Sequence, residues 1–186
     1  MAGQAPGIRI RRLRTDELTG HEIEAIRRLV WNTFEASGDG FAEEDWDHSV
    51  GGLHVVLDLE GAIVAHASVV ERILHIGDAP VRAGYVEAVA TAPGQQGRGF
   101  GSAVMAEIGD AVRREFELGA LATGAHRFYE RLGWLRWEGP TWVRTPAGPV
   151  RTEDADDAIL VLPTPAMPAP DRSLPVSCEW RPGDVW

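Results

Sequence analysis

A glycine-rich loop is the part of this sequence whose residue types point most directly to chemistry. Gly94, Gly97, Gly99 and Gly101 separate an apolar stretch from a long amphipathic one. Glycines allow several backbone N–H groups of a loop to point at one spot, and the N-terminus of the helix that follows adds the positive end of its dipole. The loop is therefore suited to bind a phosphate or a pyrophosphate, the alternative being a glycine-rich turn without a ligand.

Two familiar phosphate-binding motifs do not describe this loop. The GxGxxG fingerprint of dinucleotide-binding domains is absent, and the loop follows the fourth predicted strand rather than the first. A Walker loop needs a lysine, whereas all 18 basic residues of this chain are arginines. The absence of lysine also excludes Schiff-base catalysis.

Acidic side chains are the second feature with chemical meaning. The chain has 28 acidic and 18 basic residues and a formal net charge of −10, which argues against nucleic acid or an anionic membrane as a partner and favours a cationic ligand. The acids cluster at 39–47, 153–157 and 184–186. Since each ammonium group of a polycation needs an oxygen acceptor, such clusters could line one cleft, although each could also be a solvated face.

Cysteine and histidine give weaker signals. The single cysteine, Cys178, excludes an internal disulfide, a thiol relay and a cysteine-ligated zinc site. His54, His66 and His75 lie in strand-like stretches without a helical i,i+4 partner, so we expect them to be core or surface histidines and expect no metal. No signal peptide and no apolar run of about 18 residues is visible, which makes the cytoplasm the expected location.

The elements that must position these residues follow from the spacing of apolar side chains. Ile8 and Ile10 alternate with arginines, which predicts a strand with one buried face. Thr19 and Glu22 form a capping box that begins a helix, and the helical spacing of apolar residues continues to about Thr33.

The rest of the chain predicts a mixture of strands and helices around one sheet. Glu60-Gly61 is typical of a hairpin turn, and the proline-rich segment at 163–175 should be extended. The order of elements predicts a single α/β domain over residues 1–186, with a mixed central sheet flanked by helices. The expected elements after the first helix are a loop at 35–41, a short helix at 42–50, strands at 53–59, 62–76 and 81–90, a long helix at 104–116, a strand at 118–123, a short helix at 125–131, and strands at 134–138, 141–145 and 158–162.

The loop sequence QGRGFG at 96–101 matches the pattern Q/R-x-x-G-x-G/A. Together with VEAVAT before it and AHRFYERLGW downstream, this motif resembles the Gcn5-related N-acetyltransferase family. The resemblance implies an acetyl-CoA co-substrate, with coenzyme A bound where the central strands splay apart. The backbone expected to hold the pantetheine arm belongs to Val89, Ala90 and Thr91. The residues expected to hold the diphosphate are Gln96, Gly97, Arg98, Gly99, Phe100, Gly101 and Ser102.

Further stretches are similar to the aminoglycoside 2'-N-acetyltransferases and cover most of the chain from about residue 39 to its end. They are DWDHSVGGLHVVL, GAIVAHASVVER, AGYVEAVA, LGWLRWEGPT, RTEDADDAILVLP and CEWRPGDVW. The resemblance implies antibiotic resistance through acetylation of the 2'-amino group of aminoglycosides, by direct transfer in a ternary complex. Family relatives are often dimers, so a homodimer is one option for this chain.

Two stretches differ from these relatives, the loop at 35–41 and the segment LGALATGAHRFY, and both lie where the acceptor sugar is expected. An amino-sugar antibiotic of another shape, such as kasugamycin, or a polyamine is therefore the alternative acceptor. A non-catalytic acyl-CoA-binding sensor is a third hypothesis.

Acetyl transfer to an amine requires that the amine lose a proton and that the leaving thiolate, with a free pKa of ~8.5, gain one. Glu87 is a carboxylate in an apolar strand, where burial would raise its pKa and suit it as a base acting through water; it could instead pair with an arginine. Tyr129 stands at the tyrosine of the family motif and would be the acid, or else an ordinary packed residue. Many family members carry an asparagine one turn earlier, where this chain has Ala125 and His126.

The resemblance also implies which residues bind the acceptor. The C-terminal carboxylate of Trp186 is expected to help position the amine or its water, and the extended tail at 163–186 to complete the site. The residues expected to contact the cationic amino sugar are Asp39, Asp45, Asp154, Asp184 and Trp186.

Overall fold

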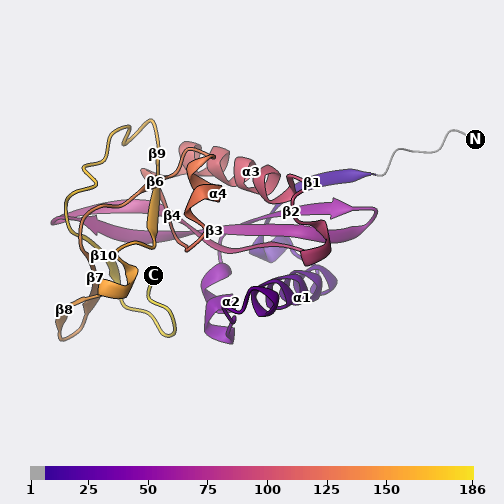
Figure 1. The fold of residues 1–186 in the computed structure, drawn as a ribbon, viewed down its shortest axis with the longest axis horizontal. Helices are drawn as coiled ribbons and strands as arrows, with labels where there is room; N and C mark the ends of the chain where they lie inside the picture. Colours follow the sequence, from indigo (N-terminus) through magenta and orange to yellow (C-terminus); the bar gives the residue numbers. More distant parts are fainter. Residues whose placement is uncertain (1–6) are drawn as a thin grey trace, which may run out of the picture. The chain divides into compact units, whose positions relative to one another are not determined.

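The computed structural model of the chain describes residues 7–186, which form two compact units. The first consists of the described residues up to Val70 together with Glu87–Ile108, and the second of Glu71–Val86 together with Gly109–Trp186. Three elements contribute residues to both units. They are β3 (Ala62–Ile76), β4 (Ala79–Thr91) and α3 (Phe100–Glu115), all labelled in Figure 1. The expectation of one domain over residues 1–186 stays a prediction.

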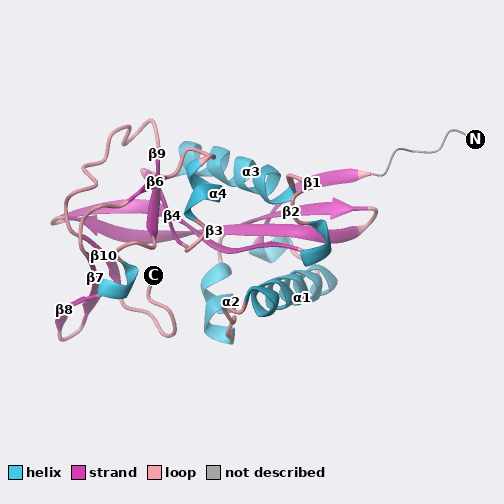
Figure 2. Ribbon diagram, in the orientation of Figure 1, coloured by secondary structure: helices cyan, strands magenta, loops and turns pink. Residues whose placement is uncertain are grey.

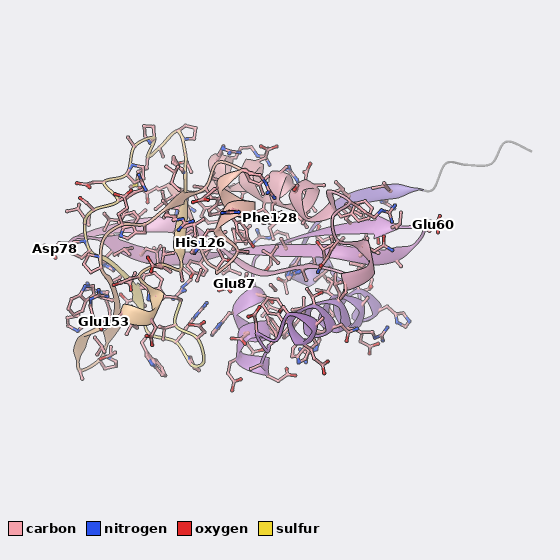
Figure 3. The ribbon with its side chains drawn as sticks, in the orientation of Figure 1. Glu60, Asp78, Glu87, His126, Phe128 and Glu153 are labelled. Atoms are coloured by element: carbon pink, nitrogen blue, oxygen red, sulfur yellow. The ribbon has the colours of Figure 1, made fainter. Side chains whose placement is uncertain are left out.

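The strands of the first unit are antiparallel, in the order β1 (Ile8–Arg14), β2 (Leu53–Leu59) and β3. Glu60 and Gly61 join β2 to β3 with φ angles of 53° and 86°, and Figure 3 shows Glu60 at the tip of this hairpin. Two consecutive left-handed residues are the signature of the type I′ turn, whose twist matches that of the strands. The predicted hairpin is confirmed.

Helix α1 (Gly20–Ser37) begins at the predicted capping box, because Thr19 Oγ1 accepts the Glu22 N–H at 3.3 Å and Glu22 Oε2 accepts the Thr19 N–H at 2.9 Å. The helix runs further than predicted and ends where Gly38 adopts φ 83° and donates its N–H to Phe34 O at 3.0 Å. The predicted loop at 35–41 therefore begins only after residue 37.

The core of the first unit lies between α1, the short helix α2 (Glu43–Ser49) and the strands. Ile26 and Trp46 from the two helices pack with Val56 of β2 and Ala90 of β4. Figure 1 shows α1 and α2 on one side of the strands, with the start of α3 on the other. The helices are cyan and the strands magenta in Figure 2.

Strand β1 corrects one expectation about burial. Ile8 and Ile10 are 55% and 38% exposed, whereas Leu13 packs against the core. The strand lies at an edge of the sheet, where it pairs with β2. Its polar contacts run through the intervening arginines, since Arg12 pairs with Glu107 of α3 at 2.5 Å. The prediction of one buried face was wrong for the first half of this strand.

The strand order in the sheet is β6-β9-β5-β4-β3-β10-β7-β8, and the second unit holds these strands except for the parts of β3 and β4 that belong to the first unit. Strands β5, β7 and β9 lie close to their predicted positions, β6 is shorter than predicted, and β8 and β10 were not predicted. Strand β10 is antiparallel to β3 and parallel to β7, so the C-terminal tail enters the sheet. The bounds of these elements are β5 (Leu118–Ala122), α4 (His126–Glu130), β6 (Leu135–Arg136), β7 (Thr141–Thr145), β8 (Gly148–Arg151), β9 (Ile159–Pro163) and β10 (Val176–Glu179).

The two histidines of the first unit's hairpin are fully buried, at 0% exposure each. His54 Nδ1 lies 3.0 Å from His66 Nε2, and His66 Nδ1 lies 2.8 Å from Ala88 O. The other end of the pair meets a hydroxyl, with Thr15 Oγ1 2.9 Å from His54 Nε2. Burial lowers the pKa of His54 to about 4 and that of His66 to about 3. Both imidazoles are therefore neutral at physiological pH.

This pair should make the stability of the protein depend on pH. Below pH 6.5 the unfolded chain protonates both imidazoles, whereas the folded chain resists protonation until the pH approaches 4 and 3. The stability that the two neutral histidines contribute should therefore be present above pH 6.5. The free energy of unfolding should fall by about 2 kcal/mol per histidine between pH 7 and pH 5.

Urea unfolding followed by circular dichroism across this range measures the effect. His54→Leu should remove a large part of the slope, while His21→Gln, at an exposed histidine, should leave it intact. A slope in His54→Leu equal to that of the native chain would contradict the assignment.

Candidate active site

The predicted site residues are divided between the two units. The first unit carries the proposed base, the pantetheine strand, the glycine loop and the first acidic cluster, with Glu87, residues 89–91, residues 96–102, Asp39 and Asp45. The second unit carries the proposed acid and the C-terminal acids, with Tyr129, Asp154, Asp184 and Trp186.

Strand β4 is irregular at the point where the coenzyme is expected. Ala88 has φ 49°, in the left-handed region that a residue with a Cβ rarely adopts. The side chains of Ala88 and Ala90 pack into the core beneath α1, whereas Glu87 and Val89 are half-buried. Ser68 Oγ donates to Glu87 O at 3.2 Å, and Figure 3 labels Glu87 on the strand. Residues with strained backbone of this kind cluster at functional sites, and Ala88 lies between Glu87 and the residues expected to hold the pantetheine arm.

The glycine loop has the geometry of an anion site. Gly97 and Gly99 adopt φ 75° and 84°, and a Cβ at either would meet no atom within 4 Å, so glycine is required by backbone conformation and not by space. The first bond of α3 runs from Ala103 N–H to Gly99 O at 2.9 Å. The N–H groups of residues 100–102 therefore lack an intrahelical acceptor and lie at the positive end of a helix of 16 residues.

Arg98 adds the one cationic side chain of this loop. Its guanidinium lies 4.8 Å from the Phe100 ring centroid and donates to Gln95 Oε1. Gln96 in turn donates from Nε2 to Thr91 O at 3.3 Å, which ties the loop to the end of β4. Backbone donors, a helix N-terminus and an arginine together form a donor set that fits a diphosphate.

The acidic cluster of the first unit has partly structural roles. Asp45 Oδ2 accepts the Ala42 N–H at 2.8 Å and so caps α2. Glu43 pairs with Arg27 at 2.5 Å. Asp39 is exposed just beyond α1, where Oδ2 accepts from Ser37 Oγ at 2.8 Å. Asp45 is thus a fixed, half-buried carboxylate, whereas Asp39 is presented to solvent.

Tyr129 is buried in the second unit, on the short helix α4. Its ring makes edge contacts with Phe128 and Trp134, at centroid distances of 4.8 and 6.2 Å. Burial raises the pKa of the phenol well above its usual value, so Tyr129 is protonated at neutral pH and its hydroxyl is able to donate a hydrogen bond. His126, one turn earlier, has a buried Nε2 without a hydrogen-bond partner among residues 7–186.

The C-terminal residue is held on several sides. Trp186 is 5% exposed, its indole Nε1–H donates to Thr152 Oγ1 at 2.9 Å, and its backbone N–H donates to Asp184 Oδ1 at 3.1 Å. Arg181 donates from Nη2 to a terminal oxygen of Trp186 at 3.3 Å. The preceding carbonyl, of Val185, accepts from an arginine on β3 at 2.8 Å. The terminal carboxylate therefore has a defined position within the second unit.

Asp156 is a residue whose role was not predicted. It pairs with Arg151, and its Oδ1 accepts from both the backbone N–H and the hydroxyl of Thr141 at 2.9 Å. These bonds, that of Arg151 first, hold its pKa well below the usual range. Thr152 Oγ1 lies 2.9 Å from Thr141 Oγ1 and accepts the hydrogen bond from the Trp186 indole N–H. Asp156 thus holds Thr141 and Arg151 in place beside Thr152, the residue that binds the Trp186 indole. Asp154, in contrast, is exposed on the adjacent turn.

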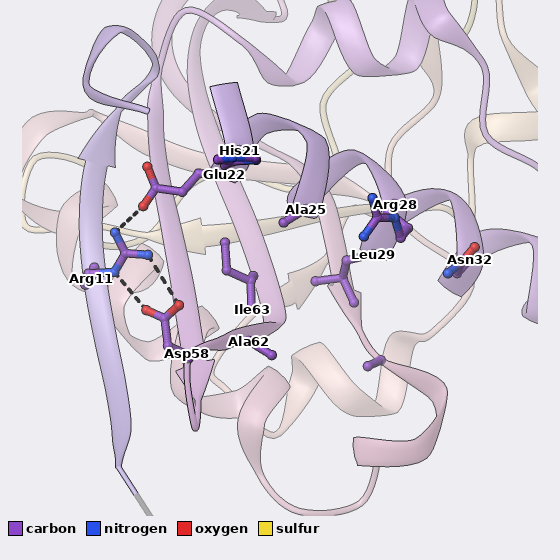
Figure 4. Close-up of a pocket in the computed structure, with 12 residues that line it drawn as sticks. Arg11, His21, Glu22, Ala25, Arg28, Leu29, Asn32, Asp58, Ala62 and Ile63 are labelled. Atoms are coloured by element: carbon purple, nitrogen blue, oxygen red, sulfur yellow. Dashed lines mark hydrogen bonds and ion pairs between the residues drawn. The ribbon is translucent and has the colours of Figure 1, made fainter. Parts of the chain in front are cut away.

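A separate pocket of about 490 Å³ in the first unit contains none of the predicted site residues. Figure 4 shows its polar centre, where Arg11 lies between Asp58 at 2.8 Å and Glu22 at 2.5 Å. The Thr19 backbone N–H, followed by Arg11, lowers the pKa of Glu22 to about 2. These charges are satisfied by one another and join β1, β2 and α1.

Two kinds of structural feature are absent from residues 7–186. No helix there combines the length and apolar character needed to cross a bilayer. No group of three or more histidine, cysteine or acidic side chains in the same part of the chain could hold a metal ion.

Comparison with known proteins gives concordant matches. The sequence pattern of the acetyltransferase (GNAT) domain matches residues 10–136. The aminoglycoside 2'-N-acetyltransferase of Mycolicibacterium fortuitum is 42% identical over 180 residues, which cover 95% of this chain and 91% of that protein.

Solved structures share the fold at lower identity. A GCN5-related N-acetyltransferase from Kribbella flavida has a TM-score of 0.59 at 21% identity over 73% of this chain, which spans only 34% of that larger protein. A GNAT family acetyltransferase from Brucella melitensis in complex with acetyl-CoA has a TM-score of 0.57 at 20% identity, covering 70% of this chain and 84% of that one. The predicted mixed α/β fold is confirmed.

The anchoring of the C-terminus can be tested at Thr152. Thr152→Val removes the acceptor of the Trp186 indole N–H and should cost about 1–2 kcal/mol of unfolding free energy, because a buried donor is left without a partner. The variant should also release its C-terminal tryptophan to carboxypeptidase faster than the native chain does.

Thr152→Ser retains the hydroxyl and is the matched control for this substitution. It should resemble the native chain in both thermal unfolding and digestion. Equal behaviour of the valine and serine variants would show that the hydroxyl does not hold the terminus.

Proposed function

This chain belongs to the GNAT acetyltransferase family, and we propose that it transfers the acetyl group of acetyl-CoA to the 2'-amino group of aminoglycosides. The observation that carries the proposal is the 42% identity, over 95% of the chain, to a protein named for that reaction. The fixed terminal carboxylate and the acids near it suit a polycationic acceptor.

The coenzyme half of the proposal rests on the first unit. The N–H groups of residues 96–102 and the guanidinium of Arg98 would hold the diphosphate, and the backbone of residues 89–91 would hold the pantetheine arm. A chain without lysine can bind a diphosphate in this way because the donors are mainly backbone groups. Bound acetyl-CoA supplies the thioester carbonyl that the amine attacks.

The proposed proton transfers involve Glu87 and Tyr129. Glu87 accepts a proton from the substrate ammonium through a water molecule, which leaves the amine able to attack. Tyr129 donates a proton to the departing thiolate. Burial raises the pKa of the phenol, so Tyr129 keeps its proton at neutral pH and has one to donate.

The acceptor is held by carboxylates in this proposal. Asp39 and Asp154 are exposed and offer their oxygens to ammonium groups directly. Asp45 and Asp184 each accept one backbone N–H, and a carboxylate has further lone pairs that remain for a ligand. The backbone contacts reduce the rotamer freedom that these two side chains lose on binding, which favours affinity.

A panel of acceptors tests the proposal. Release of free coenzyme A should be seen with aminoglycosides that carry a 2'-amino group and not with matched compounds that carry a 2'-hydroxyl, and NMR of the product should place the acetyl group at the 2' position. Kasugamycin and a polyamine belong in the same panel. Turnover of either one, with none for the 2'-amino compounds, would show that the protein catalyses the same acetyl transfer to a different acceptor.

Tyr129→Phe tests the acid. The ring contacts remain, so the fold and the aminoglycoside Kd should be little changed, while kcat should fall by about 10²–10⁴-fold, the usual contribution of a positioned acid. Stopped-flow detection of thiol release and calorimetry of drug binding measure the two quantities. Phe128→Leu, at the neighbouring ring, controls for packing. Unchanged turnover in Tyr129→Phe would remove the tyrosine from the mechanism.

A single glycine added after Trp186 tests the terminal carboxylate. The addition moves the charge by one Cα–Cα step of about 3.8 Å and leaves the indole contact with Thr152 available. The KM for the aminoglycoside should rise by at least tenfold, and the KM for acetyl-CoA by far less. An equal change in both constants, or none, would be inconsistent with a role in acceptor binding.

A further inference from the structure

A series of hydrogen bonds in the first unit runs from an exposed loop into the core and ends at the irregular residue of β4. It begins at the Gly51 N–H, which donates to Thr15 Oγ1 at 2.8 Å, and passes through His54 and His66 to Ala88 O. Both imidazoles have no exposed surface. The proposed acetyl transfer makes no use of this series of hydrogen bonds. The series nevertheless ends at Ala88, which lies between Glu87 and Val89.

The direction of every bond in this series can be derived. A carbonyl oxygen only accepts, so His66 must carry its proton on Nδ1, and its Nε2 must accept because the ring is neutral. His54 must then donate from Nδ1 and accept at Nε2. The Thr15 hydroxyl, which accepts from the Gly51 N–H, therefore directs its one proton to His54 Nε2 at 2.9 Å, and its contact with Gly52 O at 3.3 Å is the longer and weaker of the two. All donors point the same way, and aligned bonds strengthen one another.

The end of the series determines the orientation of one peptide plane. The Ala88–Val89 peptide is trans, so its C=O and N–H point in opposite directions. When His66 draws the Ala88 carbonyl toward β3, the Val89 N–H must point to the opposite side of β4. A left-handed Ala88 is costly, and the bond from a buried imidazole favours the peptide orientation that goes with it.

We propose that His66, held in its tautomer by His54 and Thr15, is a positioning residue that aims the Val89 N–H at the acetyl thioester. This inference rests on the proposed acetyl transfer. The imidazole does not touch the reacting groups; it acts through the peptide. A neutral N–H aimed at the thioester oxygen would be worth most as charge develops there, so its misalignment should affect turnover more than coenzyme binding.

The first test needs neither substrate nor substitution. Nitrogen-15 NMR of the ligand-free chain, labelled at histidine, should show His54 and His66 both as the Nδ1–H tautomer, with shifts that do not change between pH 8 and pH 6. An Nε2–H tautomer at His66, or titration of either ring in this range, would overturn the proposal whatever the activity of the protein.

The second test compares two substitutions at one position. His66→Asn retains an N–H donor at the place of Nδ1, whereas His66→Leu removes it. In assays of coenzyme A release, His66→Leu should lower kcat by about 10–100-fold with the KM for acetyl-CoA changed less than about threefold. His66→Asn should restore most of kcat. Equal kcat in the two variants, or a native kcat in His66→Leu, would overturn the proposal.

Thr164→Val is the matched control for loss of a buried hydrogen bond. It removes a hydroxyl that donates to a backbone carbonyl, Glu117 O, at 2.6 Å in the second unit, and it should keep the native kcat. A fall in Thr164→Val as large as that in His66→Leu would assign the effect to stability and overturn the positioning role. Absence of acetyl transfer by the native chain to every acceptor would instead refute the proposed function, while the tautomer result would stand.

Discussion

The left-handed conformation of Ala88 is the constraint on which the first unit depends. It interrupts the regular backbone of β4 at a cost of about 1–2 kcal/mol, so other contacts must hold it. The methyl group of Ala88 is buried in the core beneath α1, and its carbonyl accepts from a buried imidazole. The core beneath α1 and the His66 imidazole of the β2–β3 hairpin thus both contact the residue of β4 that has the unusual backbone angle, and Glu87 directly precedes it.

In the second unit, several contacts hold the C-terminal residues in one position. Arg72 donates to Val185 O at 2.8 Å, Arg181 donates to Asp184 O at 2.8 Å, and both guanidinium groups lie over the ring of Tyr85, at 4.6 and 5.6 Å. Planar guanidinium groups stack and donate at the same time, which an ammonium group cannot do. The acid excess of the chain is therefore not a uniform surface charge, since Asp156 and Asp184 are used to orient backbone and side chains around Trp186.

Local patterns were sufficient to predict some elements, and distant partners decided the others. The capping box of Thr19 and the turn at Glu60-Gly61 depend on neighbouring residues and were found. The strand at 176–179 was missed because its short, mixed sequence becomes a strand through β3 and β7 on its two sides. The glycine loop was found from its composition and Tyr129 through motif resemblance. The contact between His54 and His66 arises from strand register, and the contacts of Asp156 arise from the turn after β8, so neither can be read from periodicity. The roles of the site residues, a homodimer and a cytoplasmic location stay predictions.

The glycine loop has a consequence for how this sequence can change over time. Its anion-binding groups belong to the main chain, so most substitutions at Gln96 would leave the backbone donors in place, whereas Gly97 and Gly99 are confined by their positive φ angles. Selection on this loop should therefore act mainly on the backbone conformation of Gly97 and Gly99, and less on the chemistry of the other side chains. A genome whose base composition disfavours lysine codons can encode such a loop without loss.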